Sequence, residues 1–367
     1  MRIEQLRERL RALGANPRHE QRVLRLWSLA LSQTSGRRQV EHFLPAALVS
    51  ELPAIADELA ALARLESQHP GEDGSARLLV KLGDGQMVET VLLPRDGVCV
   101  STQIGCAVGC VFCMTGTTGL IRQVGSAEIV AQVALARTLR PVKKVVFMGM
   151  GEPAHNLDNV MEAIDLLGTV GNIGHKNLVF STVGDPRVFE ALPRGRVKPA
   201  LALSLHTTKA DLREQLLPRA PRLTPQELVD AGERYARATG YPIQYQWTLL
   251  EGVNDGDDEV EGIAALLTGI QAAVYGLSLW LGPKGMLAGT LLASLAELHS
   301  AVAAVMAASL PGDGQHPEVT IAAALVVHAI SKCINAAVTG GWRYVLALAP
   351  GMVLHTGVAV VWLVGLR

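Results

Sequence analysis

The middle of the chain alternates between strand-like and helix-like patterns of apolar residues. Apolar and polar positions alternate over residues 76–82 and 87–94, and the turn between them predicts a β-hairpin. Further along, short apolar runs alternate with segments of helical spacing. The predicted strands are 144–148, 177–182, 200–205 and 243–250, and the predicted helices are 126–139, 159–167, one beginning at 187–191, and 225–239. This order favours a parallel α/β sheet with helical crossovers, either open or rolled into a partial barrel.

The N-terminal segment is predicted to be helical and is locally basic. Leu6, Leu10 and Leu13 recur at helical spacing, and Gly14 and Pro17 separate them from a second such set. The first 40 residues hold nine arginines and three glutamates, although the net charge of the whole chain is -1. This pattern is typical either of a solvated charged face or of a module that contacts nucleic-acid phosphates. We expect no cleavable signal peptide, because no apolar stretch opens the chain.

The last quarter of the chain has a different character. From residue 270 onward only seven of 98 residues are charged, against 18% in the whole chain. Residues 344–364 carry no charge, and 21 residues form a helix of about 30 Å, long enough to cross a bilayer. Residues 285–310 and 319–338 are weaker candidates, and a buried helical hairpin is the alternative. We therefore expect three segments, a helical accessory domain over 1–70, a core over 71–268 and an apolar helical tail over 269–367.

Three closely spaced cysteines carry the strongest chemical signal. Cys106, Cys110 and Cys113 form the run C-A-V-G-C-V-F-C. Three thiolates hold three corners of a [4Fe-4S] cluster and leave one iron open to an outside ligand, and this spacing favours S-adenosylmethionine (SAM). A structural zinc site needs a fourth ligand and a second knuckle, and five cysteines in 367 residues make a poor disulfide scaffold. A reduced cluster indicates a cytoplasmic setting for residues 1–268.

Polar motifs follow the predicted strands of the core. They are Gly151-Glu152, Ser181-Thr182, Ser204-Leu205-His206 and Gly252-Val253-Asn254-Asp255. Each alone is also typical of a turn, a helix cap or a buried histidine. Because the carboxyl ends of parallel strands share one edge of a sheet, we expect the motifs to meet there. A cofactor with an amino acid, a ribose and an adenine needs such carboxylate, hydroxyl and amide groups.

Several of these motifs resemble those of the radical-SAM RNA methyltransferases that modify carbon 2 or carbon 8 of adenine. The resemblance rests on C-V-S-T-Q-I-G-C at 99–106, the cysteine run, V-V-F-M-G-M-G-E-P at 145–153, S-L-H and G-V-N-D, and it extends over about residues 1–268. It implies a partial (β/α) radical-SAM barrel with a helical N-terminal accessory domain. It also implies that Cys106, Cys110 and Cys113 bind the cluster. The residues that it implies for contact with SAM are Gly151, Glu152, Ser181, Ser204, Leu205, His206 and Asn254.

The resemblance further implies a radical reaction with two catalytic cysteines. Carbon 2 of adenine is not nucleophilic, so polar methyl transfer from a sulfonium fails. In the family scheme one SAM methylates a cysteine, and a radical from a second SAM takes hydrogen from that methyl group. Glu89 matches the proton acceptor, and Cys99 matches the thiol that releases the RNA and pairs transiently with the methyl-carrying cysteine. The only cysteine after Cys113 is Cys333, in an apolar segment where burial would raise its pKa and make it inert. We therefore expect the methyl-carrying cysteine to be absent, which would leave the methyltransferase inactive.

Three functions follow as hypotheses. The first is methyl transfer from SAM to an adenine carbon of RNA, and the second is cleavage of SAM without methylation. The third is a membrane protein with a radical-SAM passenger domain, because 340–344 and 349–351 resemble the end of an uncharacterised bacterial integral membrane protein family. The expected partners are RNA, an external electron donor such as a flavodoxin-like reductant, and a membrane contacted through residues 270–367.

Overall fold

The computed structural model describes residues 1–267 and the short pieces 321–322, 325–326, 329, 356–357 and 360. The chain divides into two compact units, Met1–Asp255 and Gly256–Arg367. Of the second unit, helix α9 (Asp257–Leu267) is the longest described element. The three predicted apolar spans lie outside the described residues except for those short pieces. Among the helices that the structure does describe, none has the length and apolar character that a membrane crossing requires.

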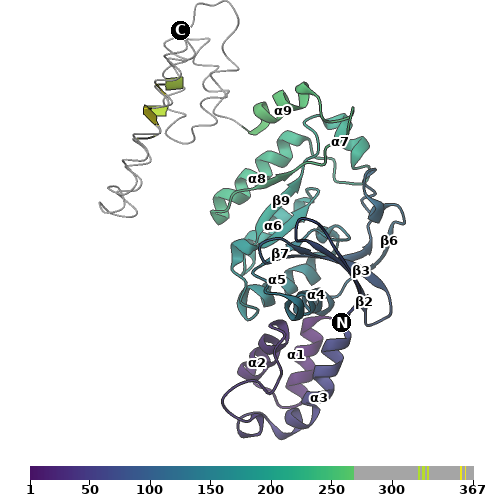
Figure 1. The fold of residues 1–367 in the computed structure, drawn as a ribbon, viewed down its shortest axis with the longest axis vertical. Coiled ribbons are helices and arrows are strands. Elements are labelled where there is room, and N and C mark those ends of the chain that lie inside the picture. Colours follow the sequence, from purple (N-terminus) through teal and green to yellow (C-terminus); the bar gives the residue numbers. More distant parts are fainter. Residues whose placement is uncertain (268–320, 323–324, 327–328, 330–355, 358–359, 361–367) are drawn as a thin grey trace, which may run out of the picture. The chain divides into compact units, whose positions relative to one another are not determined.

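Three helices lie together at the N-terminal end of the first unit (Figure 1). They are α1 (Ile3–Ala12), α2 (Pro17–Ser28) and α3 (Ala46–Ala61). Asn16 caps α2, because its side chain accepts hydrogen bonds from the backbone N–H groups of Arg18 and His19. Leu6, Leu10, Val23 and Leu24 are buried, so the two predicted amphipathic helices are confirmed.

One eight-stranded sheet forms the centre of the first unit, in the order β1-β2-β3-β4-β7-β8-β9-β10. The first four strands run antiparallel to one another, and β4, β7, β8, β9 and β10 are parallel. Their bounds are β1 Ala63–Pro70, β2 Ala76–Leu82, β3 Met87–Leu93, β4 Gly97–Val100, β7 Lys144–Phe147, β8 Leu178–Thr182, β9 Ala200–Ser204 and β10 Gln244–Gln246. The expected parallel α/β core with a hairpin is present, but as a mixed sheet. Residues 63–70 form an edge strand, because their backbone pairs with β2, and they are not the end of the predicted helical segment.

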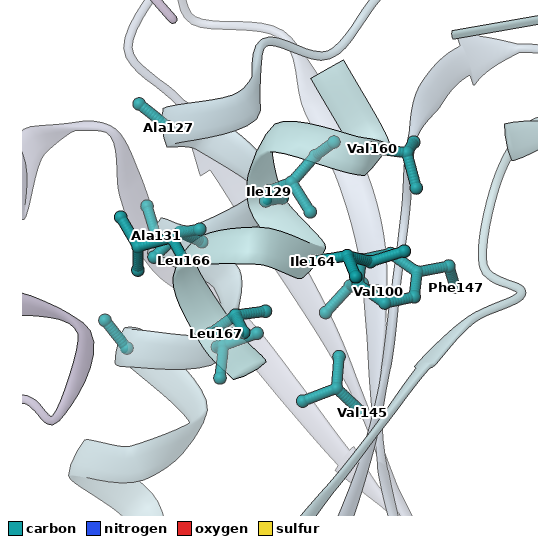
Figure 2. Packing of buried hydrophobic residues seen from close by; sticks show 14 of the residues in the cluster. Val100, Ala127, Ile129, Ala131, Val145, Phe147, Val160, Ile164, Leu166 and Leu167 are labelled. Carbon is teal, nitrogen blue, oxygen red and sulfur yellow. The ribbon is translucent and has the colours of Figure 1, made fainter. Parts of the chain in front are cut away.

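Helices connect the parallel strands and bury the apolar face of the sheet. They are α4 (Ser126–Leu139), α5 (Leu157–Thr169), α6 (Pro186–Arg194), α7 (Ala210–Leu216) and α8 (Pro225–Thr239). Figure 2 shows Ile129 of α4 and Ile164 of α5 packed toward Val100, Val145 and Phe147 of the strands. Burial of these side chains stabilises the sheet whose strand ends carry the polar motifs.

The last parallel strand is shorter than predicted. Residues 243–250 have a strand-like pattern, yet β10 covers only Gln244–Gln246. The backbone N–H of Leu250 and the backbone C=O of Thr248 bond to the side chain of Asn254, at 2.7 and 2.8 Å. The backbone here is hydrogen-bonded to a side chain and not to a neighbouring strand, so the chain leaves the sheet at this point.

A separate two-stranded ribbon frames the cysteine run. It consists of β5 (Gln103–Gly105) and β6 (Leu120–Gln123), which pair antiparallel. The backbone N–H of Cys106 donates to Gly119 O at 3.0 Å. Gly105 has φ +72°, and a Cβ there would lie 1.9 Å from Gly119 O, so only glycine fits. The ribbon closes the cysteine run into a loop beside the carboxyl ends of the parallel strands.

Candidate active site

A cavity of about 410 Å³ opens at the carboxyl ends of the parallel strands. Eight of the predicted site residues line it, namely Cys106, Cys110, Cys113, Gly151, Glu152, Ser181, Ser204 and His206. Residues that sequence reasoning did not single out also line it, among them Gln246, Trp247 and Thr248. Glu89, Cys99, Leu205 and Asn254 do not line the cavity. The structure thus brings together the three cysteines and most of the predicted cofactor contacts.

The end of α7 and the turn that follows it are hydrogen-bonded to the cysteine loop. The backbone N–H of Val111 donates to Leu216 O at 3.1 Å, and Arg219 donates from Nη1 to Ala107 O at 3.1 Å. The ring of Phe112 meets His206 edge-on, with 4.9 Å between ring centroids. These contacts tie the loop to β9 and α7, so the positions of the three thiols depend on the sheet and not on the loop alone.

Burial disfavours the thiolate form of two of the three cysteines. Burial raises the pKa of Cys106, and it raises the pKa of Cys110 to about 12, with further contributions from the neighbouring thiolates. Within the described residues no three His, Cys, Asp or Glu side chains converge on one metal ion. The ligands of a single zinc ion would have to lie within about 4 Å of one another. Cys106, Cys110 and Cys113 line one cavity and can each bind a separate iron of one cluster, so these residues fit a [4Fe-4S] cluster.

Glu152 is a buried carboxyl in the loop that follows β7. Its backbone N–H donates to the Gln103 side chain at 2.7 Å, and Oε2 accepts from the backbone N–H of Val183 at 2.9 Å. Gly151, at φ +102°, lets the chain pass the Gln103 side chain, which a Cβ would approach to 2.4 Å. Burial raises the pKa of Glu152 to about 7. A carboxylate fixed in this way is suited to a cationic ligand group.

His206 adopts a left-handed backbone conformation at the end of β9, with φ +62°. Its ring nitrogen Nδ1 accepts a hydrogen bond from the backbone N–H of Thr248 at 3.0 Å. Burial, together with the nearby Arg213, lowers the pKa of His206 to about 4. The ring is therefore neutral at physiological pH, with its proton on Nε2. It offers the cavity one hydrogen-bond donor and no charge.

Asn254 does not line the cavity, but its side chain is hydrogen-bonded to two residues that do, His206 and Thr248. Its amide nitrogen donates to His206 O at 2.7 Å and to Thr248 O at 2.8 Å, and its oxygen accepts from Leu250 N at 2.7 Å. The side chain is almost wholly buried, at 1% exposure. Asn254 thus acts on the site through His206, whereas Leu205 takes part through its backbone N–H, which donates to Gln246 O at 3.1 Å.

Replacement of Asn254 by alanine is expected to destabilise the unliganded protein by about 2–4 kcal/mol. The substitution leaves the buried carbonyl of His206 and the partly buried N–H of Leu250 without a partner, and each loss is costly. It also removes the bond to the carbonyl of Thr248, which is an exposed residue. Denaturant unfolding of the cluster-free chain measures the change. Asp255→Ala is the matched control, since Asp255 forms its bond to Gly252 N at the exposed side of the same loop. Equal stability of the two variants would contradict this account of Asn254.

Glu89 and Cys99 lie apart from the cavity. Glu89, on β3, is about half exposed and forms an ion pair with Arg77 at 3.2 Å. Cys99, on β4, is buried, and burial raises the pKa of its thiol to about 12. The four cysteines in the described part of the chain are free thiols, and Cys333 lies outside that part. The catalytic roles that the resemblance implies for Glu89 and Cys99 stay predictions.

Comparison with known proteins agrees with the fold and the cavity. Residues 100–267 match the model of the radical SAM superfamily. A crystal structure of a radical SAM methyltransferase from Sphaerobacter thermophilus is similar, with a TM-score of 0.60 and 33% identity, over 73% of this chain and 81% of that one. The fold and site are therefore those of a radical SAM protein.

Sequence relatives define the family more narrowly. A probable RNA methyltransferase of Azoarcus sp. is 76% identical over 73% of this chain and 78% of its own length. A probable RNA methyltransferase of Leptothrix cholodnii is 73% identical over 75% of this chain and 79% of its own length. The chain belongs to the family of radical SAM methyltransferases. Its cofactors are a [4Fe-4S] cluster and SAM.

Proposed function

We propose that this protein transfers a methyl group from SAM to an adenine carbon of RNA. The observation that carries the proposal is the single cavity that contains three thiols of the cysteine loop together with Glu152, Ser181, Ser204 and His206. The names of the relatives and the resemblance of the motifs support RNA as the substrate. The adenine carbon rests on the resemblance alone.

Different side chains of the cavity bind the cluster and SAM. When bound, the cluster supplies the electron that cleaves SAM. Cys106, Cys110 and Cys113 hold three of its irons through their thiolates. Glu152 accepts a hydrogen bond from the ammonium of SAM. The neutral His206 donates a hydrogen bond to SAM through Nε2. Apolar side chains also line the cavity, among them Val108, Phe112 and Val183, and they limit the side reactions of a radical.

The N-terminal helices offer a smaller basic surface than the sequence indicated. Arg2, Arg7, Arg9 and Arg11 form ion pairs with glutamates of the same unit, and Arg22 donates to backbone carbonyls of Gln33 and Ser35. The other four arginines of this segment form neither an ion pair nor such a backbone contact within the described residues, and all are exposed, namely Arg18, Arg25, Arg37 and Arg38. These four arginines are the best candidates for RNA phosphate contacts. An external electron donor is the second partner that the reaction needs.

A second candidate function is cleavage of SAM without methyl transfer. Cys99 favours it, because this thiol is buried, lies outside the cavity lining and has a pKa raised to about 12. The family scheme needs Cys99 and a methyl-carrying cysteine at the substrate. In this chain the remaining cysteine is Cys333.

One incubation separates the two functions. The full chain, reconstituted anaerobically, is mixed with a reductant, bacterial RNA and SAM labelled in its methyl group. We expect 5′-deoxyadenosine, because the cavity holds the parts that cleave SAM. Mass spectrometry of the digested RNA and of the protein then locates the label. Labelled adenine and a labelled Cys333 support methyl transfer, whereas 5′-deoxyadenosine with neither supports cleavage alone. Absence of 5′-deoxyadenosine would contradict both functions.

A further inference from the structure

Gln246 lies at a point where four parallel strands end. Its side-chain oxygen accepts hydrogen bonds from Ser181 Oγ at 2.9 Å and from Ser204 Oγ at 3.4 Å. Its amide nitrogen donates to Met148 Sδ at 2.8 Å. Its backbone oxygen accepts from the backbone N–H groups of Leu205 and His206, at 3.1 and 3.2 Å. One residue of β10 therefore contacts the ends of β7, β8 and β9, and it lines the cavity.

The surroundings fix which way the amide of Gln246 faces. A thioether sulfur such as Met148 Sδ has no proton to donate, so it bonds only to the amide nitrogen. The amide oxygen then faces the two serines and uses the hydroxyl protons of both. Each serine oxygen keeps its lone pairs free. Ser181 and Ser204 are thereby prepared to accept hydrogen bonds from a ligand, and not to donate them.

We propose that Gln246 is a positioning residue that turns Ser181 and Ser204 into a pair of acceptors for the ribose hydroxyls of SAM. This inference rests on the proposed binding of SAM in the cavity. Glu152 already provides an acceptor for the ammonium group, so the two serines are left for the other donors of the cofactor. Because the amide of Gln246 carries no charge between about pH 5 and pH 9, the orientation of the two serine hydroxyls does not change with pH over that range.

The test measures binding, without turnover. The full chain with its reconstituted cluster is titrated calorimetrically with SAM in the absence of reductant. Gln246→Met is expected to weaken binding about 10-fold, or about 1.4 kcal/mol, because both serine hydroxyls lose their fixed acceptor. Gln246→Glu keeps an oxygen toward the serines and is expected to bind more tightly than Gln246→Met. Gln244→Met is the matched control, on an exposed side chain of the same strand, and is expected to bind as the unmodified chain does.

Analogues identify the group that the serines accept from. The titrations are repeated with S-adenosylhomocysteine and with analogues of it that lack the ribose hydroxyls. The loss of affinity caused by Gln246→Met is expected to be smaller for the analogues without ribose hydroxyls than for S-adenosylhomocysteine itself. A penalty that shrinks instead when the amino group is removed would show that the serines accept from the ammonium, and it would overturn the assignment to the ribose hydroxyls. A penalty unchanged on every analogue, or no penalty, would overturn the inference.

Two controls keep the result interpretable. Iron content and melting temperature report whether Gln246→Met is folded. If it is not, Ser181→Ala and Ser204→Ala take its place, because each removes one acceptor and must show the same dependence on the ribose hydroxyls. Failure of the unmodified chain to bind SAM would refute the proposed function, whereas binding that Gln246→Met leaves unchanged would refute only the role of Gln246.

Discussion

Replacement of Cys110 by alanine is expected to abolish the iron–sulfur cluster and, with it, cleavage of SAM. Cys110 lines the cavity between Cys106 and Cys113, and its thiolate is one of three that hold the cluster. Two remaining thiolates leave a second iron without a protein ligand. Iron and sulfide per chain, the broad visible absorbance of the reconstituted protein and the yield of 5′-deoxyadenosine should all fall to background.

Cys99→Ala is the matched control for this experiment. Cys99 is also a buried free thiol of the same unit, but it lies on β4 outside the cavity lining. Its loss is expected to leave iron, sulfide and SAM cleavage unchanged, while any release of a methylated RNA would stop. Retention of the full iron content by Cys110→Ala would sink the assignment of the cluster. Loss of iron in both variants would indicate damage to the fold instead.

Local patterns predicted most of the parallel half of the fold. Helices α4 and α8 occupy the predicted residues 126–139 and 225–239, because capping residues and helical spacing are encoded in consecutive positions. The motifs after β7, β8 and β9 were found for a similar reason, since each is a contiguous stretch at the end of an apolar run. Their meeting in one cavity follows from parallel strand order alone.

Features that depend on distant partners could not be predicted in this way. Residues 63–70 have no strand-like alternation, and their burial pattern is mostly exposed, so only pairing with β2 makes them a strand. Gln246 was missed because it is one polar residue inside a predicted strand, and its importance comes from Met148, Ser181 and Ser204 on other strands. Asn254 was predicted to contact SAM by resemblance, whereas its bonds place it behind His206. In each case the decisive contact spans several elements.

The affinity for SAM is expected to depend on pH through Glu152. Burial raises the pKa of this carboxyl to about 7, so the group is largely ionised at pH 8 and largely neutral at pH 6. SAM carries a sulfonium and an ammonium, and loss of the negative charge beside them weakens binding. We expect the dissociation constant to rise about 10-fold between pH 8 and pH 6, as one pKa unit corresponds to about 1.4 kcal/mol. Calorimetric titration of the reconstituted, unreduced protein measures it.

The same shift predicts the opposite trend in the unliganded protein. The folded state keeps a proton that the unfolded state, with a carboxyl pKa near 4.5, releases. The contribution of Glu152 to the free energy of unfolding should therefore fall as the pH rises from about 4.5 to about 7, and it is measured as the difference between the unmodified chain and Glu152→Gln. SAM should offset that loss. Glu152→Gln removes both trends and is expected to bind SAM at pH 8 as weakly as the unmodified chain does at pH 6. In the folded protein His206 does not titrate between pH 6 and pH 8, because its pKa is lowered to about 4, so it does not change the affinity for SAM over that range. It does add stability as the pH rises from about 4 to about 6.5, where the unfolded histidine loses its proton, and both the unmodified chain and Glu152→Gln share this contribution. Asp185→Asn should keep the pH dependence, since Arg187 holds the pKa of Asp185 low. Equal affinities at pH 6 and pH 8 in the unmodified chain would exclude Glu152 as the group that binds the cation.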